Sequence, residues 1–198
     1  METGPLLATA LGLWAGILHA VSGPDHLAGV APLAARARSH AWRAGAAWGL
    51  GHAMGAAAAA CAALALRDQL PGLEETISSW SERIVGVILC IVGALGLAGA
   101  LRRRLHEHEA PRGALGLGFV HGAAGLSHLW AVLPALALPG VLAPGCYLGG
   151  YALGALVLVC ASAHVIGRAE ERFGGLRIER LASFASLVVG AWWLLASA

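Results

Sequence analysis

The segment HAVSGPDHLAGVAP at residues 19–32 has a counterpart in HGAAGLSHLWAVLP at residues 121–134, at a constant offset of 102. The offset aligns the pairs His19/His121, Gly23/Gly125, His26/His128 and Pro32/Pro134. Matches between glycines or alanines are common by chance in so biased a sequence, but matched histidines and prolines are not. The pattern therefore indicates an internal repeat, which decides the architecture of the whole chain.

Two further matches follow in the same order along the chain. GHAMGA from Gly51 matches GYALGA from Gly150 at an offset of 99, which also pairs Cys61 with Cys160. At an offset of 97, Glu82-Arg83 matches Glu179-Arg180, and Gly93-Ala94 matches Gly190-Ala191. The sequence therefore predicts a single domain, residues 1–198, with repeat one at about 4–101, a linker at about 102–112 and repeat two at about 113–198.

The composition indicates a membrane protein. Apolar residues make up 58% of the chain and charged residues 12%, about half the charged share of a soluble domain. Residues 113–167 contain no Asp, Glu, Lys or Arg, a run of 55 residues where one spanning helix needs about 20. Apolar runs predict spans near residues 5–22, 44–66, 84–101, 114–137, 145–167 and 181–197. We expect an all-α membrane protein with six transmembrane helices.

Each repeat then has three spans, and because three is odd the two repeats must cross the membrane in opposite directions. This is the inverted-repeat plan of many transporters. Arginine clusters at 36–43, 102–112 and 168–180 fall on alternate loops, so the positive-inside rule makes these loops cytoplasmic and both termini external. The predicted location is the cytoplasmic membrane, with the amino end retained because no basic segment precedes the first apolar run.

The remaining charge and cysteine patterns exclude other classes. The net charge is only +2, and all thirteen basic residues are arginines in the short clusters between apolar runs, so we expect no nucleic-acid partner. The four cysteines have no CxxC spacing, and a disulfide framework is not indicated.

The first span of each repeat is too long to be one simple helix. Residues 4–35 and 113–143 are each about 30 residues long, and Ser22-Gly23-Pro24 contains a helix stop followed by a helix start. Gly125 holds the equivalent place in the second repeat. Because unwound backbone at membrane depth needs a protein or polar surround, two equivalent breaks predict a substrate site.

Rare polar residues lie at these breaks. Asp25 is the only acidic residue inside an apolar run, where a lone carboxylate costs roughly 2.5–3.5 kcal/mol on insertion. Imidazole and carboxylate together suit Ni, Co, Zn or Mn. The predicted metal ligands are His19, Asp25, His26, His52, His121 and His128. A proton relay or a hydrogen-bonded polar core remains the alternative for the same residues, with Ser22 and Ser127 as supporting donors.

The segments HAVSGPDHLAGVAPLA and AWRAGAAWGLGHAMG resemble the nickel/cobalt transporter superfamily, especially its shorter, urease-accessory-type branch. HGAAGLSHLWAVLP resembles the second-half motif of that branch. The family signature is His, four residues, then Asp-His, whereas here five residues separate His19 from Asp25. The resemblance implies a role in metal recognition for His19, Asp25, His26 and His52, and the repeat adds His121 and His128.

Together these features predict a secondary transporter of a divalent transition-metal ion, nickel or cobalt first and zinc next, and not an enzyme. We expect no permanently bound cofactor, and the expected partners are the metal ion, the lipid bilayer and either a second copy of the chain or a metallochaperone. The chain has no Walker A motif, so energy would come from a gradient or a partner.

Three other readings remain open. They are a membrane accessory protein for metalloenzyme maturation, a thiol carrier using Cys61 and Cys160, and an exporter of a small solute. His106 and His108 are either a metal-collecting loop or part of a solvated charge run, and His164 is expected near the membrane interface.

Overall fold

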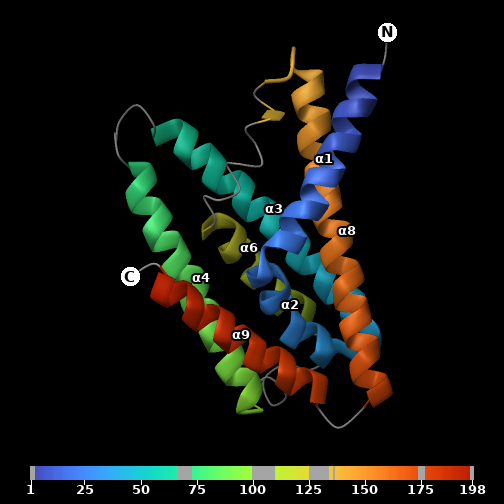
Figure 1. The fold of residues 1–198 in the computed structure, drawn as a ribbon, viewed down its shortest axis with the longest axis vertical. Helices are drawn as coiled ribbons and strands as arrows, with labels where there is room; N and C mark the ends of the chain where they lie inside the picture. The colour runs from blue at the N-terminus through green and yellow to red at the C-terminus, as the bar shows by residue number, and fades with distance from the viewer. Residues whose placement is uncertain are drawn as a thin grey trace.

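The structure is a computed structural model that describes residues 3–66, 73–99, 110–124, 134–135, 137–173 and 177–196. These residues form an all-helical bundle, as the apolar runs predict (Figure 1). The elements are α1 (Thr3–Ser22), α2 (Pro24–Ala37), the 3₁₀ turn η1 (Arg38–His40), α3 (Ala41–Leu66), α4 (Leu73–Leu97), α6 (Ala110–Ala124), α8 (Leu142–Phe173) and α9 (Arg177–Ala196).

The predicted break in the first span is present. Gly23 separates α1 from α2 and has an extended backbone, with φ −94° and ψ 95°. Pro24 opens α2 because it has no N–H to donate and its φ suits a first helical position. In the second half α6 ends at Ala124, and the predicted break at Gly125 lies outside the described residues.

Glycine faces bring α1 against α8. A side chain at Gly12 or Gly16 would meet the backbone carbonyls of Tyr147 and Tyr151, so no larger residue fits without separating the helices. Residue numbers rise together along the two helices, so α1 and α8 run in the same direction.

The pair α3 and α6 packs in the same way. Gly118 and Gly122 lie against the backbone of Trp48 and His52, and the numbers again rise together. By contrast, Gly45 and Gly49 of α3 lie against Cys160 and Leu156 of α8 in opposite order. The helices α3 and α8 are therefore antiparallel, and α1 and α6, each parallel to one of them, point in opposite directions.

The third contact is between α4 and α9, which are also antiparallel. Gly93 packs on the backbone of Ser183 and Leu187, and Gly190 packs on Gly86 and Cys90. Two side chains hydrogen-bond across the crossing, each to a residue 97 positions away: Ser186 Oγ donates to the Leu89 carbonyl at 3.0 Å, and Cys90 Sγ to the Leu187 carbonyl at 3.8 Å.

Within the part of the chain that the structure describes, three helices are long and apolar enough to cross a membrane: Gly4–Ser22, Leu142–Phe173 and Arg177–Ala196. Large apolar side chains cover the outside of the bundle, among them Leu6, 75% exposed, and Trp192, 67% exposed. Large exposed apolar side chains in this number are typical of a surface that contacts lipid or another protein. The short helix α2 is enclosed by the others, and nearly all its side chains are buried (Figure 1).

Candidate metal centre

The helix break presents polar side chains from both of its ends. His19 lies in the last turn of α1, and Asp25 and His26 lie in the first turn of α2. The amino end of a helix carries partial positive charge, which stabilises the Asp25 carboxylate there. The His19 carbonyl accepts the Gly23 N–H and the Ser22 hydroxyl, each at 3.1 Å, which closes the end of α1.

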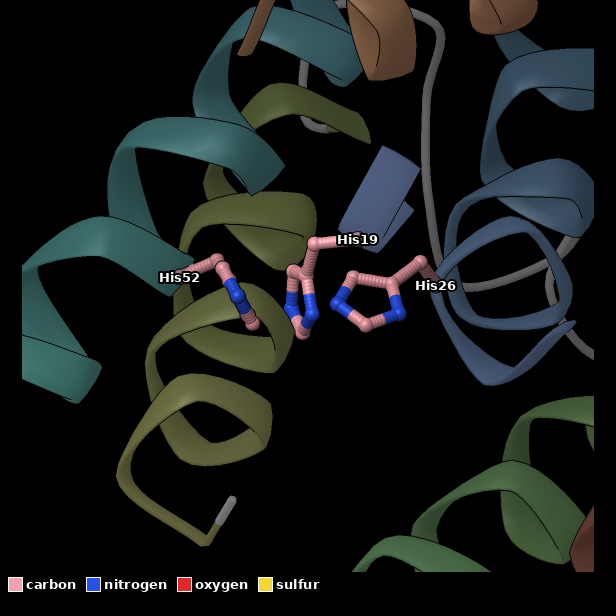
Figure 2. Close-up of side chains that lie close together, drawn as sticks. All are labelled: His19, His26 and His52. Atoms are coloured by element: carbon pink, nitrogen blue, oxygen red, sulfur yellow. The ribbon is translucent and has the colours of Figure 1, made fainter. Parts of the chain in front are cut away.

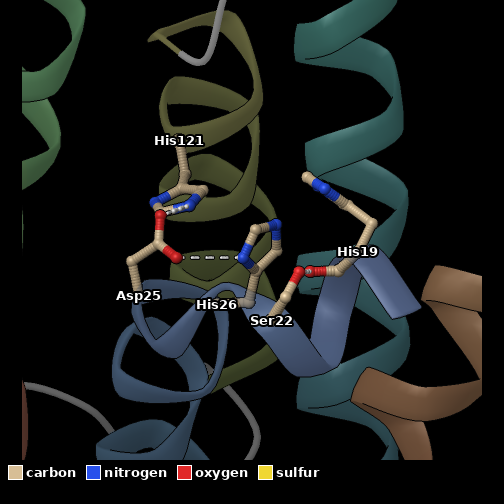
Figure 3. Close-up of polar contacts among 5 residues, drawn as sticks. All are labelled: His19, Ser22, Asp25, His26 and His121. Carbon is tan, nitrogen blue, oxygen red and sulfur yellow. Dashed lines mark hydrogen bonds and ion pairs between the residues drawn. The ribbon is translucent and has the colours of Figure 1, made fainter. Parts of the chain in front are cut away.

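Asp25 bridges two histidines. Its Oδ1 lies 3.1 Å from Nδ1 of His26, and its Oδ2 lies 3.1 Å from Nε2 of His121, which α6 contributes (Figure 3). All three residues are buried. An ionised carboxylate can only accept hydrogen bonds, so both imidazoles donate to it, and the lone pair of each neutral ring is on its other nitrogen.

Gly23 leaves the space in which this bridge forms. A side chain at this position would meet Nδ1 of His26, and would come within 2.8 Å of Oδ1 of Asp25. Its backbone conformation is open to any residue. The glycine is therefore required for room at the site and not for its φ angle.

A second group contains only histidines. His19, His26 and His52 come from α1, α2 and α3, and each offers a nitrogen within 4.8 Å of the other two (Figure 2). The ring centroids of His26 lie 4.6 Å from His19 and 5.0 Å from His52. Nitrogens around a tetrahedral ion with bonds of about 2.0–2.1 Å lie roughly 3.4 Å apart, so small ring movements would close this triad on an ion.

Among the described residues, Asp25, His26 and His121 form another group with ligand atoms within 4.8 Å of one another. His26 therefore belongs to both groups. The two groups differ in burial, because His19 is half-buried whereas Asp25, His26 and His121 are all buried.

Two aromatic residues that the sequence analysis did not single out contact the histidines of this centre. Trp48, 1% exposed, stacks on His52 with ring centroids 5.1 Å apart and the planes 7° from parallel. The ring centroid of Tyr151, on α8, lies 5.5 Å from that of His19. The buried hydroxyl of Tyr151 has no hydrogen-bond partner among the described residues. A signal for Tyr151 existed, because the offset of 99 pairs it with His52.

The structure thus brings together five of the six predicted ligands, and His128 lies outside the described residues, as do Ser127, His106 and His108. Ser22 bonds to a backbone carbonyl and is exposed. His164 is exposed on α8 and belongs to neither group.

The cysteines are not part of this centre. Cys160 donates to the Trp42 carbonyl at 3.2 Å, and its backbone lies against Gly45 of α3. Cys61 is sixteen residues beyond Gly45 on the same helix, about 24 Å at 1.5 Å per residue. These two thiols cannot meet in this arrangement.

No family model and no solved structure matches the chain. The chain is 34% identical to the chloroplast protein FOR GROWTH AND FERTILITY 2 of Arabidopsis thaliana over 187 aligned residues, which cover 86% of this chain and 50% of that protein. It is also 34% identical to FOR GROWTH AND FERTILITY 1 of the same plant over 192 residues, 86% of this chain and 52% of that protein. The chain spans about half the length of these curated relatives.

These relatives correct the family assignment. The prediction that the chain belongs to the nickel/cobalt transporter superfamily is wrong, because the proteins it matches over most of its length are the two chloroplast proteins. The prediction depended on three short motifs, at residues 19–34, 41–55 and 121–134. Such a motif answers a local requirement, the presentation of a carboxylate and imidazoles inside an apolar span, and this chemistry does not identify one family.

Proposed function

We propose that the chain is a membrane transporter for a divalent first-row transition-metal ion, which it binds at the break between α1 and α2. The observation that carries the proposal is the convergence of nitrogen atoms from His19, His26 and His52 within 4.8 Å, beside the buried Asp25. Burial of ionisable residues among apolar helices costs free energy, and in membrane proteins such residues mark ion pathways.

The chemical nature of the candidate ligands restricts which metal ions the centre can bind. Three imidazoles and a carboxylate suit Ni, Co, Zn or Mn, and no cysteine is among the candidate ligands. Nickel and cobalt remain the first ions to test, with zinc beside them. The ion is cargo in this proposal, so no resident cofactor and no enzymatic step is involved.

We further propose six spans in two inverted repeats. Support comes from the α4–α9 crossing, where Gly93 and its repeat mate Gly190 make equivalent contacts at an offset of 97. The repeat mates α1/α6, α3/α8 and α4/α9 each run in opposite directions, as an inverted repeat requires. This plan is consistent with both termini external and with a multi-pass location in the cytoplasmic membrane, or in a chloroplast membrane if the names of the relatives apply.

One part of the repeat is shifted. Gly12 and Gly16 of α1 contact α8 in the same way as Gly118 and Gly122 of α6 contact α3, so the helix contacts align the repeats at an offset of 106. The histidine motifs align at an offset of 102. The difference of four residues is about one helical turn. Because of this shift, His121 of α6 lies at the same height as His52 of α3, whereas His19 lies further along α1 than the point that contacts Tyr151 of α8. The two halves of the centre are therefore not equivalent in position.

Other functions have less support. An accessory protein for metalloenzyme maturation would use the same ligands, and only a flux measurement separates it from a transporter. A thiol carrier needs Cys61 and Cys160 together, but Cys160 lies against Gly45 of α3, and Cys61 is about 24 Å further along that helix. An exporter of a small anion would favour an arginine at the centre, and the described centre contains histidines and a carboxylate.

The test is metal binding and flux with purified protein. Protein in detergent is titrated with Ni²⁺, Co²⁺, Zn²⁺ and Mn²⁺ by calorimetry, and proteoliposomes are assayed for metal entry with an internal metal-sensitive dye. We expect one bound ion per chain and a flux that His26→Ala abolishes. His164→Ala is the matched control, because it removes an imidazole outside both groups. Folded parent protein that binds none of these ions would refute the proposal.

A further inference from the structure

The two groups of candidate ligands share one residue. His26 belongs to the triad with His19 and His52 and to the group with Asp25 and His121. On the basis of the proposed function, we infer that the centre is two overlapping ion positions, an outer and an inner one, which are filled one at a time and exchange the ion across His26.

The hydrogen bond from His26 to Asp25 specifies which ring nitrogen of His26 is available to the ion at the outer position. Its Nδ1 donates to Asp25 at 3.1 Å, so its Nε2 holds the lone pair that serves the outer position with His19 and His52 (Figure 3). Asp25 then orients the ring from behind, the carboxylate–histidine–metal arrangement that is common in metal sites. In this state the ion is held by imidazoles alone.

The inner position uses the opposite edge of the ring. An ion among Asp25, His26 and His121 replaces the two hydrogen bonds of Asp25 and takes the lone pair of His26 on Nδ1. A neutral imidazole has one lone pair for a metal, so His26 serves only one position at a time. When the ion moves inward, both rings that donate to Asp25 exchange a proton with water. His26 gives up the proton on Nδ1 and takes one on Nε2, and His121 gives up the proton on Nε2 and takes one on Nδ1, so the charge of each ring is unchanged.

Burial indicates the order of the two positions. The outer group contains the half-buried His19, whereas every member of the inner group is buried. The two groups also belong to different parts of the fold, because α1 and α3 complete the outer position and α6 completes the inner one. An ion that moves between them passes from residues of the first repeat alone to the interface between the two repeats, which is where inverted-repeat transporters hold their substrate.

The experiment separates binding from movement in single variants. His52→Gln disables the outer position and His121→Gln the inner one, and glutamine keeps the approximate size and hydrogen-bonding capacity of the ring. We expect each variant still to bind one Co²⁺ at the position that it keeps, and to lose flux because the ion has no second position to move to. His26→Ala is expected to lose binding altogether.

Cobalt absorption gives a readout that a merely structural role would not move. His121→Gln leaves three nitrogen donors, whereas His52→Gln leaves two nitrogens and a carboxylate, so the bound Co²⁺ spectra of the two variants should differ. Circular dichroism checks that both variants are folded, and His52→Ala and His121→Ala are the second set if either glutamine variant is not.

The outcomes are distinct. If either single variant loses binding as completely as His26→Ala, the centre is one site and the two-position inference is wrong while the proposed function stands. Two Co²⁺ ions bound at once to the parent would also overturn it. Parent protein that binds no ion refutes the proposed function itself.

Discussion

Replacement of Asp25 by asparagine distinguishes a cation site from a hydrogen-bonded polar core. Asp25 accepts hydrogen bonds from His26 and His121, both at 3.1 Å. Asparagine has nearly the same size and keeps one acceptor oxygen, but it has no charge and its amide group donates. One imidazole therefore keeps its bond, and the other must turn or exchange its proton.

The structure sets the size of the effect. A hydrogen bond to a charged group contributes about 1.5–3 kcal/mol, and the variant loses roughly one such bond together with the anion. Since about 1.4 kcal/mol corresponds to a factor of ten, metal affinity should fall about 10- to 100-fold. Loss of an orienting carboxylate in metal sites has an effect of the same size. Folding should survive, because the polar volume is still filled.

The assay is calorimetric titration of the parent and of Asp25→Asn with Ni²⁺, Co²⁺ and Zn²⁺, with flux measured in proteoliposomes. Glu171→Gln is the matched control, because it removes one carboxylate charge at an exposed pair with Arg168 on α8. The control should bind and transport as the parent does. If Asp25→Asn binds and moves all three ions as well as the parent, Asp25 is structural and the proposed centre lacks its central member.

Four other predictions concern the break, the helix crossing, pH and topology. Gly23→Ala should fold but bind metal at least about tenfold more weakly, because its methyl group displaces Asp25 and His26. Gly149→Ala is the control and should match the parent, because the space around Gly149 is open. Equal metal affinities of Gly23→Ala and the parent would contradict this prediction. Ser186→Ala should lower stability by about 0.6–1 kcal/mol through loss of its bond to α4, and an unchanged thermal unfolding midpoint in detergent would count against that bond. Metal binding, measured by equilibrium dialysis, should weaken as the pH is lowered, because protonated imidazole has no lone pair, and an affinity that stays constant down to about pH 4 would argue against histidine ligands. Reporter fusions should find both termini outside, and a cytoplasmic carboxyl terminus would reverse the proposed topology.

The aromatic surroundings show what sequence reasoning could not reach. Trp48 stacks on His52 one turn away on α3, and Tyr151 faces His19 from α8. Neither residue type is unusual in an apolar helix, so neither attracts attention before its neighbours are known. The pairing of Tyr151 with His52 at offset 99 was visible, but it predicted equivalence in a repeat and not contact with the centre.

The family assignment failed for a related reason. The His19 to His26 segment reports a local chemical requirement, and the relatives are recognised by similarity spread over most of the chain. A short motif therefore predicted where the polar centre lies better than it predicted the lineage of the protein.

The sequence by itself determined the helical runs, the break at Gly23 and the identity of the polar residues beside it. These features depend on contiguous residues, through hydropathy, the missing N–H of Pro24 and the cost of a lone carboxylate in an apolar run. Only the tertiary structure decided that His52 and His121 join the break, and that His26 stands between two groups. These contacts depend on the register between helices. Glycines and alanines recur all along the chain and allow several registers, so packing of whole helix faces selects the one that forms.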